Sequence, residues 1–154
     1  MSNFFAELEE GFKNHADQPA LILSGQDDWS YAELLLQINR AAAELAAIGA
    51  GAGDRVLVQL PKSSENLALY LACLKLGLVY VPLNTGYTAA ELDYFVSDAE
   101  PVLYVGEQHR SDVVSATLQL RDAERLLVFS NGASTSDDLA IPLTAVRATD
   151  DLAA

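Results

Sequence analysis

The chain has 154 residues, of which 51% are hydrophobic, and its 9 basic and 22 acidic residues give a net charge of −13. A chain of this length and composition can bury a core as one globular domain, which excludes the disordered and collagen-like classes. The negative charge would repel the phosphates of nucleic acid and the anionic face of a membrane, so we expect neither partner.

Targeting signals and disulfides are not indicated either. The start, MSNFFAELEE, lacks the basic residues and apolar stretch of a signal peptide. The most apolar segment, residues 67–83, is shorter than a membrane span and is interrupted by Lys75, Gly77 and Pro82. The single cysteine, Cys73, lies in this apolar segment and indicates a buried thiol in a reduced, cytoplasmic location.

The first predicted elements are a hairpin and a long helix. Residues 20–23 and 29–31 flank the polar stretch SGQDD, which is typical of a hairpin turn. Ser30 and Glu33 have the spacing of a capping box, and apolar residues then recur at helical spacing up to Ile48. Gly49 suits the left-handed residue that ends a helix, so we predict a helix over 31–48.

The stretch GAGAGD, residues 49–54, raises the question of a nucleotide phosphate site. A dinucleotide motif needs its glycines after a strand and at the start of a helix, whose free N–H groups bind the phosphates. Here the glycines follow a helix and precede the strand RVLVQL, residues 55–60, and Asp54 occupies the slot of the third glycine. We therefore predict a helix end and a tight turn.

The next helix begins after a strand and offers a candidate anion contact. Pro61 ends the strand, Ser63 or Ser64 can cap a helix over 64–76, and Glu65 lies in its first turn. Lys62 and the N–H groups beside it could bind an anion at the carboxyl end of the strand. We favour a capped helix start beside a solvated lysine, because Glu65 already occupies the positive end of the helix.

The rest of the chain alternates between strands and helices. The helix over 64–76 is apolar on two sides, which predicts burial between two layers, and the unbroken apolar strand 78–83 predicts a strand covered on both faces. Further signals are a capping box at 88–91 that starts a helix, strands at 102–105 and 125–130, a weaker helix at 110–120 and a polar loop at 131–138. This alternation predicts an α/β fold of three layers: a mostly parallel sheet with helices on both faces, preceded by the N-terminal β-hairpin.

Catalytic and metal-binding patterns are not found. His15 and His109 have no carboxylate or thiol at ligand spacing, and no serine lies in a nucleophile elbow. We expect both histidines at the surface, and we assign no catalytic residue and no metal ligand.

Three stretches carry a family resemblance. WSYAEL (29–34), GAGDRV (51–56) and LKLGLVYVPLN (74–84) resemble, in order and spacing, the first landmarks of adenylate-forming (AMP-binding) enzymes: acyl-CoA synthetases, luciferases and the adenylation domains of peptide synthetases. The continuation through residue 101 is most similar to the malonyl-CoA synthetase branch, which implies a role in fatty acid metabolism. The resemblance covers nearly the whole chain.

The resemblance implies an activity and also an incomplete enzyme. Members activate a carboxylate with ATP and magnesium, and the synthetases pass the acyl group to coenzyme A. Their phosphate loop, of the type T-S-G-T-T-G-x-P-K-G, is expected just after ATDDLAA (148–154) and is not in this sequence. Residues 1–154 are therefore expected to form an N-terminal subdomain without the phosphate loop, the rest of the large domain and the C-terminal domain.

We expect the isolated chain to bind no cofactor, to be non-catalytic, and to self-associate through the apolar face that the remainder of the synthetase would cover. The full-length acid-thiol ligase would use ATP, magnesium and coenzyme A. Two alternatives stay open: a stand-alone, non-catalytic α/β binding or interaction module, and a fragment of a peptide-synthetase adenylation domain.

One loop could touch a ligand in the intact enzyme. In relatives, the turn after the VPLN-type strand lies near the coenzyme A nucleotide, and some carry an arginine where this chain has Gly86. The resemblance implies that Asn84 and Tyr87 line this region. The sequence itself favours a turn formed by Asn84 and Gly86, with Tyr87 as a hydrophobic staple before Thr88.

Overall fold

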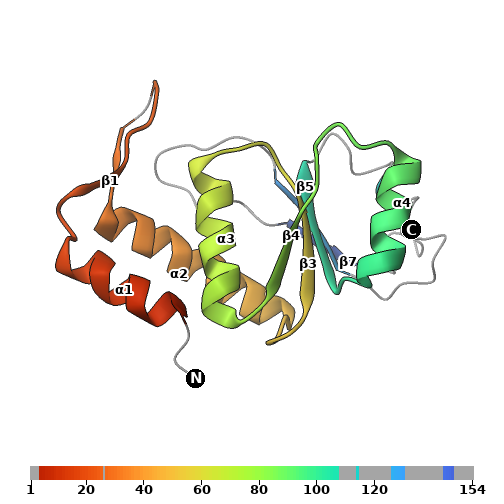
Figure 1. Cartoon of the computed structure of the whole chain (residues 1–154), viewed down its shortest axis with the longest axis horizontal. Coiled ribbons are helices and arrows are strands. Elements are labelled where there is room, and N and C mark those ends of the chain that lie inside the picture. Colours follow the sequence, from red (N-terminus) through yellow and green to blue (C-terminus); the bar gives the residue numbers. More distant parts are fainter. Residues whose placement is uncertain (1–3, 26, 108–113, 115–125, 131–143, 148–154) are drawn as a thin grey trace.

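The computed structural model describes residues 4–25, 27–107, 114, 126–130 and 144–147. The helices are α1 (Phe4–Asn14), α2 (Tyr31–Ile48), α3 (Ser64–Leu76) and α4 (Ala89–Ala99). The strands are β1 (Pro19–Leu21), β2 (Trp29–Ser30), β3 (Arg55–Gln59), β4 (Val79–Pro82), β5 (Leu103–Glu107), β6 (Leu126–Ser130) and β7 (Thr144–Arg147). Figure 1 shows helices α1 to α3 on one side of the main sheet and α4 on the other. The predicted three-layer α/β fold is confirmed.

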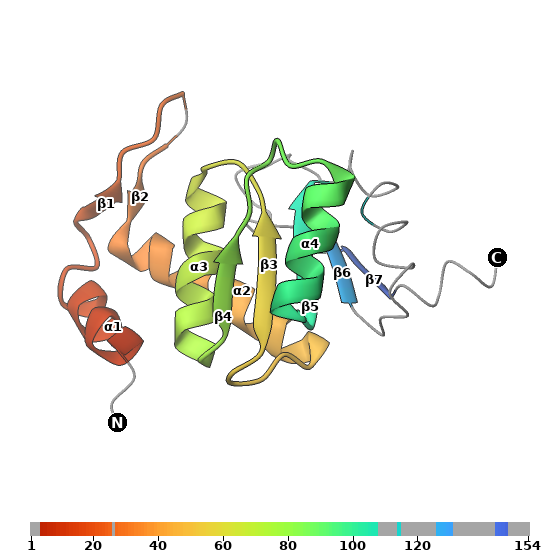
Figure 2. The ribbon, with the colours of Figure 1, turned by 45° about the vertical axis from the view of Figure 1, so that its right-hand side comes forward.

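The main sheet has the strand order β4-β3-β5-β6-β7. Its first four strands are parallel, and β7 runs antiparallel to β6, an arrangement that the sequence did not predict. Helix α3 connects β3 to the neighbouring β4, and α4 connects β4 to β5 on the other side of β3 (Figure 2). Because these two helices cover opposite faces, β3 is buried on both sides.

Alternating residues of the central strands build two cores. Val56 and Val58 of β3 pack with Leu103 and Val105 of β5 against helices α1 to α3. The intervening Leu57 belongs to the second core, under α4. Burial on both faces explains why β3 is an unbroken apolar run without polar alternation.

The predicted hairpin is present as the short antiparallel pair β1 and β2, with an irregularity in the register between Pro19 and Leu21. It projects from the body beside α1 and α2 (Figure 1). Trp29 packs partly buried against the first core, whereas Ile22 is 85% exposed. The hairpin is therefore attached through Trp29 together with Ala20 and Leu21, which also pack against the first core.

The helix ends follow the predicted caps with two refinements. Ser63, and not Ser64, caps α3 by accepting from the Asn66 backbone N–H at 3.0 Å. Thr88 and Glu91 form a complete capping box at α4. The second refinement is at α2, where Ser30 accepts from the Glu33 backbone N–H but the Glu33 carboxylate accepts from the Gln37 side chain.

The GAGAGD stretch is a helix end followed by a turn, as predicted. Gly49 ends α2 with a left-handed φ of 98°, which glycine adopts without steric cost. The Asp54 carboxylate accepts from the Gly51 N–H at 2.8 Å, and the Gly53 N–H donates to the Gly77 carbonyl at 2.9 Å. These groups stabilise the turn, which precedes β3 and so lies at the amino ends of the strands.

Helix α1 was not predicted from the sequence. Phe5, Leu8 and Phe12 recur at spacings of three and four and pack on the first core. This helical periodicity was therefore present in the sequence. Lys75 of α3 contacts α1 through the Glu9 carboxylate. The N-terminal segment is thus an integral part of the helical layer.

The strand after Gly77 was predicted to be covered on both faces, and this prediction was wrong. Among the described strands β4 lies at the edge of the sheet, and Val79 is 45% exposed. Val79 and Leu83 donate their backbone N–H groups to the β3 side. Because backbone groups alternate in direction along a strand, those of Tyr80 and Pro82 face away from β3. Pro82 places its missing N–H at the free edge, where proline is tolerated.

Burial agrees with the other predictions for single residues, with one exception. Helix α3 packs against α1, α2 and β4, and Cys73 on it is completely buried. The exception is Tyr70 on one of its two apolar sides, which is 40% exposed. His15 is exposed, as expected, and its Nδ1 lies 2.9 Å from the Gly11 carbonyl.

His109, the predicted loop 131–138 and most of the predicted helix 110–120 lie outside the described residues. No helix in the described part of the chain is long and apolar enough to cross a membrane.

Candidate functional site

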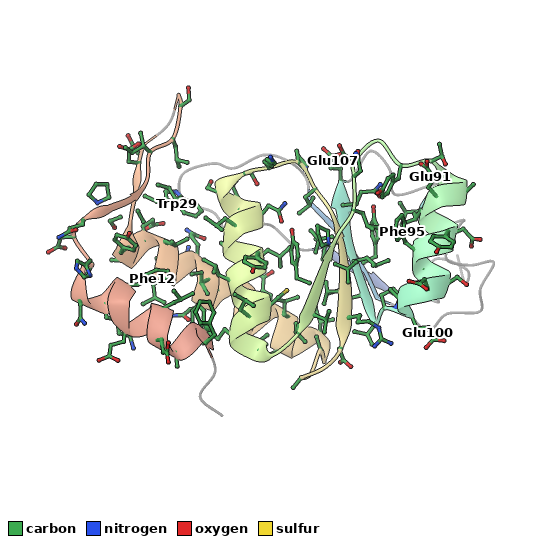
Figure 3. All side chains as sticks on the ribbon, viewed as in Figure 1. Phe12, Trp29, Glu91, Phe95, Glu100 and Glu107 are labelled. Atoms are coloured by element: carbon green, nitrogen blue, oxygen red, sulfur yellow. The ribbon has the colours of Figure 1, made fainter. Side chains whose placement is uncertain are left out.

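The loops after β3 and β4 form the candidate site. Ligands of open parallel sheets bind beyond the carboxyl ends of the strands, and these two loops begin there. Lys62 lies in the loop after β3, and Asn84 and Tyr87 lie in the loop after β4. Figure 3 shows Glu107, at the end of β5, and Glu91, in the first turn of α4, at this same end of the molecule.

Lys62 lies beside the capped start of α3. The lysine is exposed, and Ser63 next to it accepts the Asn66 N–H. The Asn66 side chain donates to the Pro61 carbonyl at 3.3 Å and accepts from the Tyr80 hydroxyl at 2.6 Å. The Ser64 hydroxyl lies 3.1 Å from the Glu65 carboxylate. This geometry matches the solvated lysine that the sequence favoured and leaves its ammonium group accessible to an anion.

The loop after β4 is a compact turn. The Asn84 Oδ1 accepts from the Gly86 N–H at 2.8 Å, and the Asn84 carbonyl accepts from the Tyr87 N–H at 3.1 Å. The Tyr87 ring stacks on Phe95 of α4 with centroids 5.1 Å apart. The turn therefore holds Asn84 exposed and Tyr87 half-buried, in the arrangement predicted from the asparagine and the staple.

Two residues that the sequence analysis missed support this turn from below. The Gln59 Nε2 donates to the Asn84 carbonyl at 2.9 Å, and the Gln59 Oε1 accepts from the Tyr104 hydroxyl at 2.6 Å. Gln59 is completely buried, and Tyr104 is 1% exposed. A signal was available, because Gln59 is a polar residue inside the apolar run RVLVQL, and a buried amide requires partners.

The three predicted residues lie on two loops. Asn84 and Tyr87 share one turn, but Lys62 lies on the loop that leads to α3, on the opposite face of the sheet from α4. The site thus consists of two neighbouring loops at the carboxyl ends of the strands. The glycine-rich turn at 49–54 lies at the amino ends of the strands and takes no part in it.

The buried Cys73 is not suited to covalent chemistry, and the described residues hold no metal cluster. Burial raises the pKa of the Cys73 thiol to about 12, so the thiol stays protonated and is a poor nucleophile. Burial also raises the pKa of the Tyr80 hydroxyl. No cluster of three His, Cys, Asp or Glu residues suited to a metal ion occurs in the described part of the chain. The site can position a ligand through hydrogen bonds, one exposed cation and an aromatic edge.

Crossover helices on both faces of a mostly parallel sheet define the chain as a doubly wound α/β domain. Comparison with known families is more specific, since residues 8–151 match the model of the AMP-binding enzyme family. The chain belongs to this family.

Similar proteins cover several activities. An uncharacterized acyl-CoA ligase of Bacillus subtilis, YtcI, is 34% identical over 107 residues, which are 70% of this chain and 20% of that protein. Surfactin synthase subunit 2 of the same organism is 32% identical over 123 residues, which are 79% of this chain and 3% of that protein. The crystal structure of apo MatB from Rhodopseudomonas palustris aligns with a TM-score of 0.76 and 38% identity, over 92% of this chain and 28% of that one. The chain thus spans less than a third of the length of each.

Proposed function

We propose that the chain is the N-terminal subdomain of an ATP-dependent acyl-CoA synthetase, which converts a carboxylate, ATP and coenzyme A to acyl-CoA, AMP and pyrophosphate. The family match over residues 8–151 carries the proposal. Support comes from acyl-CoA ligases among the similar proteins and from ATP-bound MatB, which is 37% identical over 92% of the chain. The single buried cysteine supports a reducing, cytoplasmic location.

The proposed substrate is malonate or another small carboxylic acid, which would place the enzyme in fatty acid metabolism. The resemblance of residues 82–101 to malonyl-CoA synthetases supports this choice. Magnesium would neutralise the ATP phosphates during adenylation. Its ligands are expected elsewhere in the polypeptide, because the described residues hold no suitable cluster.

Within this enzyme, the chain would contribute binding and not catalysis. We propose that Asn84 and Tyr87 line the coenzyme A nucleotide and that Lys62 contacts an anionic group. The exposed position of Asn84, the half-buried Tyr87 ring and the accessible lysine suit these roles. The isolated chain is proposed to be inactive, since it has no phosphate loop to hold ATP.

The isolated chain is also proposed to self-associate. Supporting features are the free edge of β4 and the apolar side chains exposed among the described residues, including Val79, Val102 and Tyr94. Sedimentation over a concentration range tests this, and a strictly monomeric profile at high concentration would contradict it.

The function is tested on the complete polypeptide that carries this chain. The protein is incubated with ATP, magnesium, coenzyme A and a panel of carboxylates, and acyl-CoA and AMP are measured. We expect malonate-dependent formation of both products in equal amounts. Activity with other small acids alone would correct the substrate, and the absence of any carboxylate-dependent AMP would favour a non-catalytic binding module.

A second candidate is an adenylation domain of a peptide synthetase. The match to surfactin synthase subunit 2 covers 79% of the chain, a larger share than the 70% covered by the match to YtcI. An adenylation domain would activate an amino acid and transfer it to a carrier protein. Amino-acid-dependent exchange of pyrophosphate into ATP, without acyl-CoA formation, would identify this activity.

A further inference from the structure

A buried chain of hydrogen bonds runs under the 84–88 turn. It begins at the Tyr104 hydroxyl on β5, passes through the Gln59 amide on β3, and ends at the Asn84 carbonyl after β4. Asn84 is 25 residues and Tyr104 is 45 residues from Gln59 in sequence, but β4, β3 and β5 are adjacent in the sheet. The turn is therefore connected to the centre of the sheet through side chains.

The direction of each hydrogen bond in this chain is fixed. A backbone carbonyl only accepts, so Gln59 must present its NH₂ group to Asn84. Its Oε1 then faces the Tyr104 hydroxyl, which must donate. Gln59 and Tyr104 are both buried, so water does not readily replace either hydrogen bond when one is lost.

Gly106 makes room for this arrangement. It pairs with Gln59 in the β3–β5 register, and a β-carbon at Gly106 would lie 2.5 Å from Cε1 and 2.7 Å from Cζ of Tyr104. The Tyr104 ring thus occupies the space that a side chain at residue 106 would fill. This position brings its hydroxyl to the Gln59 amide.

The Asn84 carbonyl is shared between this buried chain and the turn. It accepts from Gln59 on one side and from the Tyr87 N–H on the other. The Tyr87 ring is stacked on Phe95, so the same carbonyl relates the sheet to the position of that ring. A displacement of the carbonyl would move the turn's exposed groups.

We propose that Gln59 and Tyr104 are positioning residues for coenzyme A. They hold the Asn84–Tyr87 turn in its binding geometry without touching the ligand. This inference rests on the proposed function, in which the turn lines the coenzyme A nucleotide. Loss of the Gln59 hydrogen bonds then weakens the thioester-forming half of the reaction and leaves adenylation unchanged.

The test uses Gln59→Met and Tyr104→Phe in the complete polypeptide. Both substitutions keep most of the side-chain volume, and Tyr104→Phe removes only the hydroxyl. Val105→Ala is the matched control, because Val105 is fully buried on the opposite face of β5 and truncation lowers stability without touching the turn. The readouts are amide hydrogen exchange of residues 84–88, the KM for coenzyme A, and the rate of malonate-dependent pyrophosphate exchange into ATP.

For Gln59→Met we expect faster amide hydrogen exchange in the turn and a KM for coenzyme A raised about fivefold, which corresponds to losing the one hydrogen bond that Gln59 donates to the turn. Tyr104→Phe should also speed amide hydrogen exchange in the turn and raise the KM for coenzyme A, but by less. Pyrophosphate exchange should stay at the wild-type rate in both variants, and Val105→Ala should leave the turn and the KM unchanged.

The inference would be overturned by amide hydrogen exchange in the turn that stays at the wild-type rate, or by faster amide hydrogen exchange with an unchanged KM for coenzyme A. An equal loss in both half-reactions would also overturn it, because that pattern indicates general destabilisation. A wild-type protein that forms no acyl-CoA at all would instead refute the proposed function. Faster exchange in the variants of such a protein would still show that Gln59 holds the turn.

Discussion

Lys75 on α3 and Glu9 on α1 are 66 residues apart in sequence, and the lysine Nζ lies 3.3 Å from the carboxylate Oε1. The same Nζ donates to the Asn39 side chain on α2 at 2.6 Å and lies 5.6 Å from the centre of the Phe5 ring. One ammonium group therefore joins all three helices of the first layer. It holds the N-terminal helix against the body of the domain.

Replacing this lysine should loosen α1. Lys75→Met keeps the apolar stem but removes the charge, and we expect a loss of about 1 kcal/mol in the free energy of unfolding, together with earlier proteolysis in residues 4–14. Urea unfolding and limited proteolysis measure both. Lys13→Met is the control, because Lys13 is 64% exposed and lies 3.9 Å from Glu9. Equal effects of the two substitutions would contradict the role of Lys75.

A methyl group at Gly106 should destabilise the sheet. Gly106→Ala would push the Tyr104 ring away and break its hydrogen bond to Gln59, with an expected cost of about 1–3 kcal/mol. Gly11→Ala is the matched control: Gly11 lies within α1, has open space at its β-carbon position, and should stabilise the chain by about 0.5–1 kcal/mol. Chemical denaturation of both variants measures the difference. A tolerated alanine at residue 106 would show that the tyrosine ring can rearrange freely.

The carboxylate of Glu44 on α2 should lower stability at neutral pH. Burial raises the pKa of Glu44, and its Oε2 is buried without a hydrogen-bond partner among the described residues. With a folded pKa above the unfolded value, stability is retained below about pH 4.5 and falls as the pH rises through the folded pKa. Glu44→Gln should therefore stabilise the chain at pH 7 and give no gain at pH 4.

The control for Glu44 is Glu10→Gln, which removes the same negative charge from an exposed position on α1. Urea midpoints at the two pH values measure both variants. An equal gain from Glu10→Gln would assign the effect to the overall charge of −13 and not to burial.

The Cys73 thiol should be unreactive in the folded chain. Its pKa is raised from 9.0 to about 12, so between these values the unfolded state has lost a proton that the folded state keeps. Stability should therefore fall with rising pH across this range, and less steeply in Cys73→Ala. An aromatic disulfide reagent at pH 8 should label the chain only in denaturant. Rapid stoichiometric labelling of the folded chain would contradict the buried position.

An arginine at residue 86 should strengthen coenzyme A binding if the 84–88 turn lines the nucleotide. The β-carbon position of Gly86 lies 3.2 Å from the Asn84 Oδ1, so a small shift of that side chain admits the substitution. Gly86→Arg in the complete polypeptide should lower the KM for coenzyme A by about threefold, and less at high salt. Gly86→Gln, similar in length but uncharged, should not lower it. The same KM in both variants would place the coenzyme A phosphates elsewhere.

Local signals predicted the helices that begin with strong caps. Ser30, Ser63 and Thr88 each accept a backbone N–H in the first turn, and Gly49 and Gly77 end their helices in the left-handed conformation. Such caps depend on residues three or four apart, so they can be recognised in sequence. Helix α1 carried the same kind of spacing and was overlooked.

Position within the sheet could not be predicted in the same way. The segments around Leu57 and Val81 are both short apolar runs, yet β3 is buried on both faces while β4 lies at the edge of the described sheet. Strand order depends on where the crossover helices pack, which no local pattern encodes. The antiparallel β7 was missed for the same reason.

For the candidate site, the sequence by itself determined the turn chemistry of Asn84 and Tyr87 and the solvated position of Lys62. Only the tertiary structure placed Gln59 and Tyr104 beneath that turn, because their hydrogen bonds join three strands that meet only when the sheet is assembled. A cap or a turn depends on residues that are only two to four positions apart, so it can be recognised in the sequence. A buried amide finds its partners only through long-range strand pairing, and the pairing of β3 with β4 also made the two loops of the site neighbours.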